Sequence, residues 1–201
     1  MSGTTVAGVV LAAGEGRRMG RAKALCRAGG KTLLERMIRA LRAGGCRPVV
    51  AVIREELLGT IRAECRLDGI ELLVNPRPEL GQISSLRLSL RVLAESRSVV
   101  VALVDQGDLQ AETVDRVIRA LGRAPAAVAA FRGTPGHPVA FGREVYPLLQ
   151  SPIADQGAHA VVEMLRAEGR LMTVPADDAG VLRNINTPAE LEAFRRSLRR
   201  R

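Results

Sequence analysis

The feature that most constrains the fold is an apolar run near the N-terminus that leads directly into a glycine-rich loop. Residues Val6 to Leu11 form an uninterrupted, valine-rich segment, which is followed by Ala12-Ala13-Gly14. A continuous apolar run of this length is typical of a parallel strand that is covered on both faces. We therefore predict a buried parallel strand whose carboxyl end opens into a loop of small residues.

Strand-like and helix-like segments alternate along the rest of the chain. The predicted helices cover residues 31–43, 55–65, 83–93, 111–121, 156–166 and 188–198, and the predicted strands cover residues 6–11, 48–53, 70–74, 99–104, 126–131, 139–141, 171–174 and 181–185. This order predicts an α/β fold with three αβα layers and a mostly parallel sheet. No internal repeat or linker is visible, and we expect a single domain over residues 1–201.

Composition places the chain among ordinary globular proteins, with 47% hydrophobic and 25% charged residues. No apolar run reaches the ~18 to 20 residues that span a bilayer. The first residues carry no basic segment of the kind that begins a secretory signal. Cys26, Cys46 and Cys65 have neither metal-ligand nor redox spacing. We expect a cytoplasmic protein with reduced, buried thiols and no membrane partner.

The net charge of +9 raises the question of nucleic acid. Basic residues are spread along the chain, however, and an aromatic content of 2% leaves little for stacking on bases. Excess positive charge also suits small polyanions such as nucleoside triphosphates. Nucleic acid is therefore the less favoured partner. Of the thirty basic residues only Lys23 and Lys31 are lysine, which hints at positions that need a compact ammonium.

Two segments resemble phosphate-binding motifs, the dinucleotide fingerprint and the Walker A loop, but neither segment matches its motif fully. The stretch that begins Gly14-Glu15-Gly16 has Met19 where a dinucleotide fingerprint needs its third glycine. Gly30-Lys31-Thr32 resembles the end of a Walker A loop, but Leu25 stands where the first glycine is required. Neither a dinucleotide fold nor a P-loop is predicted.

A different phosphate site remains after the first strand. Gly14 and Gly16 allow the backbone to approach a ligand closely, and backbone N–H groups in such a loop can form an anion-binding concavity. Arg18 and Lys23 follow as cationic clamps for a triphosphate. The alternative is a glycine-rich connection with solvated basic residues.

Several segments together resemble one family. Residues Leu11 to Gly20, followed by Lys23, look like the signature loop of nucleotidyltransferases, and the nearest resemblance is to the MobA-like NTP transferases, in particular the cytidylyltransferases of molybdenum cofactor. The resemblance continues in the segments Gly30-Lys31-Thr32-Leu33-Leu34-Glu35, Asn75-Pro76, Gly81-Gln82-Ile83-Ser84-Ser85-Leu86, Asp105-Gln106, Gly136-His137-Pro138, Asp155-Gln156-Gly157-Ala158-His159 and Asn186-Thr187-Pro188.

This resemblance implies a Rossmann-like, GT-A-like nucleotidyltransferase fold and transfer of CMP or GMP from an NTP to a phosphorylated acceptor. It implies molybdopterin as the acceptor, with a sugar phosphate left open, and Ala-Ala-Gly after the first leucine favours CTP. Lys23, Arg18 and Asp105 would be catalytic. The implied nucleotide-binding residues are Leu11, Ala12, Ala13, Gly14, Gly16, Arg18, Lys23, Gly81, Ser84 and Ser85.

The resemblance also implies a magnesium ion held by Asp105 and Asn186. Magnesium prefers hard oxygen ligands, and Asp105 follows a predicted buried strand, where ligands of open α/β sheets bind. The alternatives are that Asp105 caps a turn and that Asn186 caps the last helix. Many relatives carry aspartates at the positions of Asn184 and Asn186, so we expect weaker magnesium binding.

His137 and Asp155 are the expected acceptor-binding residues, although His137 could instead only shape a turn. Two further departures bear on activity. Gly107 stands where the family has proline, which would loosen the turn after Asp105, and His159 stands where arginine is common. The rival hypothesis is a non-catalytic or regulatory nucleotide-binding homologue. A molybdoenzyme or a second copy of the chain is the expected protein partner.

Overall fold

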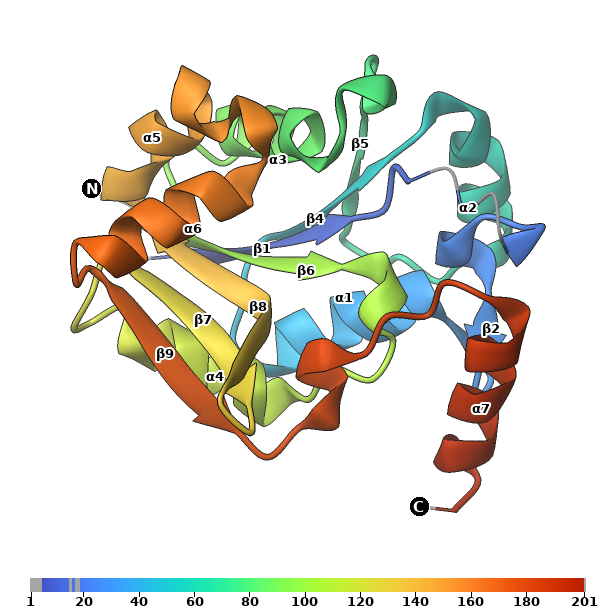
Figure 1. Ribbon diagram of the computed structural model, residues 1–201. Helices are drawn as coiled ribbons and strands as arrows, with labels where there is room; N and C mark the ends of the chain where they lie inside the picture. Colours follow the sequence, from blue (N-terminus) through green and yellow to red (C-terminus); the bar gives the residue numbers. More distant parts are fainter. Residues whose placement is uncertain (1–4, 15, 17–18, 201) are drawn as a thin grey trace.

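The computed structural model describes residues 5–14, 16 and 19–200, and its centre is a single mixed sheet (Figure 1). Within these residues seven strands lie in the order β5 (Glu71–Val74), β4 (Val49–Ile53), β1 (Val6–Leu11), β6 (Ser98–Leu103), β8 (Thr134–Gly142), β7 (Ala126–Phe131) and β9 (Leu171–Ala176). Only β8 runs antiparallel to its neighbours. The predicted mostly parallel α/β sheet is confirmed.

Helices cover both faces of this sheet. They are α1 (Leu33–Ala43), α2 (Leu58–Glu64), α3 (Gln82–Val92), α4 (Ala111–Ala120), α5 (Tyr146–Gln150), α6 (Ala158–Ala167) and α7 (Pro188–Leu198). In Figure 1, α3, α5 and α6 lie above the sheet, and α1 and α4 lie below it. Successive strand residues alternate between the two cores, so that Val9 packs toward α3 while Val10 packs toward α1. The predicted three αβα layers are confirmed.

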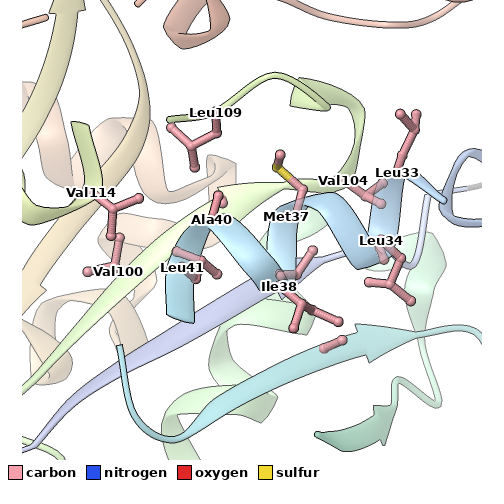
Figure 2. Close-up of a cluster of buried hydrophobic side chains, with 14 of the residues drawn as sticks. Leu33, Leu34, Met37, Ile38, Ala40, Leu41, Val100, Val104, Leu109 and Val114 are labelled. Carbon is pink, nitrogen blue, oxygen red and sulfur yellow. The ribbon is translucent and has the colours of Figure 1, made fainter. Parts of the chain in front are cut away.

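The first long helix shows why the sequence folds as it does. Thr32 accepts a hydrogen bond from the amide of Glu35, and the Glu35 carboxylate accepts one from the Thr32 amide, which forms a capping box. Figure 2 shows the buried face of α1 lying against strand and loop residues, among them Val100, Val104 and Leu109. Each fully buried leucine on such a face contributes about 1.5–3 kcal/mol.

Several predicted elements differ in their bounds from the structure. The helix predicted from residue 31 begins at Leu33, because β3 (Lys31–Thr32) pairs with β2 (Arg27–Ala28) in a small antiparallel hairpin. The strand predicted at 139–141 is part of the longer β8, and α5 was not predicted. These differences reflect non-local strand pairing and a short helix that periodicity does not reveal.

The strand predicted at 181–185 is wrong. Residues Ala179–Leu182 form a 3-10 helix, because the Asp178 carboxylate accepts a 2.7 Å hydrogen bond from the amide of Gly180 and starts a turn. The amide of Ile185 donates to the carbonyl of Asp105 rather than to a neighbouring strand. Of the apolar side chains that suggested a strand, Val181 and Ile185 are buried on the α1 side of the sheet, and Leu182 is exposed.

Cys26, Cys46 and Cys65 are free and buried, as the sequence predicts. Burial raises the pKa of the Cys46 thiol to about 12. Among the described helices, none is long and apolar enough to cross a membrane.

Candidate active site

The candidate site lies where two neighbouring parallel strands end. In the β1–β6 pair, Leu11 stands opposite Leu103 at the carboxyl ends of the strands. The glycine-rich loop and the turn that carries Asp105 therefore leave the sheet side by side. This edge is where open α/β sheets bind ligands.

Lys23 is held at this edge by its own turn. Residues Lys23–Leu25 form a 3-10 helix in which Ala24 and Leu25 are buried. Its ammonium donates a 2.8 Å hydrogen bond to Asp105 Oδ2 and a 2.5 Å hydrogen bond to Asn186 Oδ1. The structure thus brings together three residues that the sequence singled out from distant segments.

Asp105 has one paired oxygen and one unpaired oxygen. Its side chain is only 16% exposed, and Oδ1 is buried without a hydrogen-bond partner among the described residues. The turn is fixed by the buried Gln106, whose side-chain oxygen accepts from the Leu103 amide and whose side-chain nitrogen donates to the Val181 carbonyl. A buried carboxylate oxygen without a partner is costly, which indicates that it is built for a ligand.

Asn186 does not cap the last helix. Thr187 is the N-cap of α7, and the Glu190 carboxylate accepts hydrogen bonds from the amides of both Asn186 and Thr187. The Asn186 side chain is therefore free to face Lys23 and Asp105. Asn184, the other position at which many relatives carry aspartate, is exposed.

These oxygens fit a divalent ion. Magnesium is usually held by one or two protein oxygen ligands, with the remaining positions left to substrate phosphates and water. Asp105 Oδ1 and Asn186 Oδ1 supply two hard oxygens beside a cleft. The described residues contain no group of three or more His, Cys, Asp or Glu that could hold a metal by itself. Such a donor set would suit an ion that is shared with a substrate rather than a closed structural site.

The glycine-rich loop is anchored at its start. The amide of Ala12 donates to the Val52 carbonyl, and the carbonyl of Ala13 accepts a 2.9 Å hydrogen bond from the Arg54 guanidinium. Gly16 has a φ of +62°, a conformation that L-residues other than glycine rarely adopt. Arg18, the predicted second clamp, lies outside the described residues.

A small cavity of about 170 Å³ joins this loop to the start of α3. Its lining includes Leu11, Ala13, Gly14, Lys23, Gly81, Gln82, Ser85 and Asp105. Ser84 lines a neighbouring groove instead. Its hydroxyl donates a hydrogen bond to the Gly81 carbonyl and accepts one from the side-chain amide of Asn75. Six of the ten predicted nucleotide-binding residues thus line one cavity, whereas Ala12, Gly16 and Ser84 do not line it.

A larger cavity of about 490 Å³ adjoins the small one and shares Leu11, Gly81, Gln82 and Leu103 with it. Both predicted acceptor residues, His137 and Asp155, line it. Burial lowers the pKa of His137 to about 4, against an opposing attraction from the Asp105 carboxylate. His137 is therefore a neutral imidazole near pH 7.

Some lining residues were not predicted. Gln82 borders both cavities, and His159, Glu163 and Arg166 line the larger one from α6. The last three lie at spacings of four and three residues along one helix face, so helical periodicity could have grouped them. Glu163 and Arg166 form an ion pair with each other.

The turn after Asp105 is tightly enclosed. A Cβ on Gly107 would lie 2.7 Å from Leu33 Cδ2 and 3.0 Å from Phe194 Cε1, and the Gly107 carbonyl accepts a hydrogen bond from Arg36. The Arg36 guanidinium also lies 5.1 Å from the centre of the Phe194 ring. The absence of a side chain at Gly107 therefore permits close packing around the turn, and the expectation that glycine loosens it stays a prediction.

Comparison with known proteins supplies a family. Residues 8–171 match the family described as "MobA-like NTP transferase domain". A protein of Opitutus terrae named "Probable molybdenum cofactor guanylyltransferase" is 29% identical, over 96% of this chain and 96% of that protein. The "Nicotine blue oxidoreductase" of Paenarthrobacter nicotinovorans is 33% identical, over 76% of this chain and 79% of that protein. Rv0371c of Mycobacterium tuberculosis, solved as a complex with manganese, shares the fold with a TM-score of 0.78 and 24% identity, over 96% of this chain and 100% of that chain.

Proposed function

Because the chain belongs to the MobA-like NTP transferase family of nucleotidyltransferases, we propose that it moves a CMP group from CTP to a phosphorylated acceptor. The proposal rests mainly on one observation, the meeting of Lys23, Asp105 and Asn186 at the edge where the glycine-rich loop and both cavities open. This constellation suits a triphosphate, because it offers a cation and metal-ligating oxygens around one point.

The proposed reaction is an in-line displacement. An oxygen of the acceptor phosphate forms a bond to the α-phosphorus of the NTP as the bond from that phosphorus to the pyrophosphate oxygen breaks. The electron pair leaves with pyrophosphate. The protein needs no covalent intermediate, since positioning and charge stabilisation are sufficient for this class of transfer.

Lys23 and the start of α3 would bind the phosphates of the nucleotide. The Lys23 ammonium lies on the wall of the small cavity and can neutralise charge that develops on the phosphate oxygens. The start of α3, whose N-cap Gly81 offers no side-chain hydrogen bond, borders the same cavity, and a helix N-terminus favours phosphate groups.

Asp105 and Asn186 would hold a magnesium ion. When bound, the ion would neutralise phosphate charge and polarise the α-phosphate. The orphaned Asp105 Oδ1 supports this assignment. The manganese complex of Rv0371c, a protein of the same fold, is consistent with a divalent ion in this class of protein.

CTP is the favoured donor. The small cavity of about 170 Å³ is narrowed by the side chains of Leu11 and Ala13, and a methyl group at Ala13 leaves less room than glycine would. Reduced space favours a pyrimidine over a purine. The relative of O. terrae is named for guanylyl transfer, so GTP is the competing donor.

The larger cavity would hold the acceptor. Its floor is apolar, made by Leu86, Val101, Val128, Val139 and Phe141, and polar groups lie at Asp155, Glu163 and Arg166. A flat heteroaromatic body such as the pterin of molybdopterin suits this floor, because a polyol would leave hydroxyls without partners there. The neutral His137 can donate or accept one hydrogen bond to such a ring.

The test is pyrophosphate release. Purified protein would be mixed with Mg²⁺, molybdopterin and each of the four NTPs, and pyrophosphate would be measured by a coupled assay. We expect release with CTP and none when acceptor or metal is omitted. Tight CTP binding without pyrophosphate release would favour the hypothesis of a regulatory homologue. Pyrophosphate release only with a sugar phosphate would show that the acceptor is a sugar phosphate and not molybdopterin.

The relative from P. nicotinovorans favours a second candidate, because its name describes an oxidoreductase. In that case the larger cavity would hold a flat substrate that is reduced by a dinucleotide. Oxidation of NADPH or NADH by the protein with a heteroaromatic dye would support it. The displaced third glycine of the first loop argues against a dinucleotide fingerprint.

A further inference from the structure

Lys23 contacts both of the side chains that would hold the divalent ion. Its Nζ lies 2.8 Å from Asp105 Oδ2 and 2.5 Å from Asn186 Oδ1. Both side chains of the ion pair are largely buried, with exposures of 20% for Lys23 and 16% for Asp105. The Lys23 ammonium therefore binds to oxygens of the same two side chains that would hold a metal cation.

The charges of the three described side chains that meet here balance. Asp105 contributes one negative charge, Lys23 contributes one positive charge, and Asn186 is neutral. A divalent ion that bound to Asp105 while Lys23 stayed in place would lie close to a like charge, and these three side chains together offer no net negative charge to attract it. The repulsion is strong because the pair is shielded from water.

We propose, on the basis of the proposed function, that Lys23 holds the cation position in the nucleotide-free protein and that the divalent ion enters only together with the nucleoside triphosphate. The phosphates of the nucleotide remove the repulsion between Lys23 and the divalent ion. They offer Lys23 a new partner within the same cavity, and its flexible stem lets the ammonium move to them. Asp105 and Asn186 are then released for the ion, which arrives already bound to the phosphates.

Asn186 sets this order. An aspartate at position 186 would add a negative charge, so that the site could hold the ammonium and a divalent ion at once. With asparagine the site has one carboxylate for two cations, and metal and nucleotide must bind with positive coupling. Asparagine at position 186 therefore does more than weaken a metal ligand, because its neutral side chain excludes free metal from the site.

The experiment measures metal binding without turnover. Mn²⁺ would be titrated into nucleotide-free protein, and free Mn²⁺ would be followed by electron paramagnetic resonance. The wild type should bind Mn²⁺ weakly. Lys23→Met, which removes the ammonium, and Asn186→Asp, which adds a carboxylate, should each bind it at least about tenfold more tightly.

Lys31 is the matched control, since it is the only other lysine in the chain and lies on the β2–β3 hairpin. Lys31→Met should bind Mn²⁺ as weakly as the wild type. Asn186→Asp retains every other group, so it keeps the test decisive if Lys23→Met does not fold. Equal Mn²⁺ affinity in the wild type, Lys23→Met and Asn186→Asp would overturn the inference.

A second measurement separates this inference from the proposed function. Melting temperatures of the wild type should rise more with Mn²⁺ and CTP together than the sum of the two separate shifts. Pyrophosphate release combined with tight Mn²⁺ binding by the nucleotide-free protein would overturn the binding order and leave the function standing. Exclusion of free Mn²⁺ without release from any NTP would overturn the function and leave Lys23 in the cation position.

Discussion

The amide of Ile185 donates a 2.9 Å hydrogen bond to the carbonyl of Asp105. This bond joins the turn after β6 to the segment before α7, and it brings Asn186, the next residue, to the Asp105 side chain. Two segments that are far apart along the chain thus lie side by side at the site. The arrangement makes the proposed metal position a property of the scaffold, and it leads to the following predictions.

Replacing Lys23 by alanine should abolish most turnover. The loss of one charge-stabilising donor typically costs about 10²–10³ in kcat. Circular dichroism should show a folded protein, because Ala24 and Leu25 still anchor the turn. Lys31→Ala is the control and should retain full pyrophosphate release. Unchanged turnover in Lys23→Ala would remove this lysine from the mechanism.

Asp105→Asn should impair the response to magnesium. The substitution keeps the shape of the side chain but removes the charge that would attract the ion, so pyrophosphate release should fall by about 10²-fold or more. The measurement is the release rate as a function of Mg²⁺ concentration. Asp115→Asn, on the outer surface of α4, should leave the magnesium dependence unaltered, and a similar response from both variants would contradict the assignment.

Gly107→Ala should destabilise the protein. Its Cβ would lie 2.7 Å from Leu33 Cδ2 in a fully packed region, and overpacking of this kind costs about 1–3 kcal/mol. Chemical denaturation measures the change. Gly59→Ala in α2 is the matched control, because a Cβ there meets nothing within 4 Å and should stabilise the helix by about 0.5–1 kcal/mol. Equal effects of the two substitutions would refute the packing argument.

Stability should depend on pH through His137. Its pKa of about 4 in the folded protein lies below the ordinary value of 6.5. Between these values the unfolded state binds more protons, so stability is full above pH 6.5 and falls as the pH drops toward 4. From pH 7.5 to pH 5 the loss should be about 2 kcal/mol.

The measurement for His137 is urea denaturation at the two pH values. His137→Asn, which does not titrate, should lose less stability over this interval than the wild type. His159→Asn is the control, because His159 is exposed and its replacement should leave the pH dependence of the wild type in place. Identical pH profiles for the wild type and His137→Asn would contradict the burial of a neutral imidazole.

Much of the architecture follows from local sequence. The valine-rich run from Val6 to Leu11 has no polar side, which favours a strand buried on both faces, and a parallel sheet with helices on both sides is the arrangement that provides this. The spacing of apolar residues in α1 and α4 likewise determines which faces are buried. The resemblance of the first loop, together with the order of the later segments, indicated the family, which the match over residues 8–171 bears out.

Tertiary structure alone decided how the site is assembled. The apolar residues at 181–185 match a strand pattern, but Asp178 starts a turn there and the Ile185 amide finds its acceptor on Asp105. The contacts of Lys23 with Asp105 and Asn186 cross separations of 82 and 163 residues. Local periodicity reports which face of an element is buried, but it carries no information about which distant element lies against it. The meeting of Lys23, Asp105 and Asn186 and the neutral His137 therefore emerge only when the chain is folded.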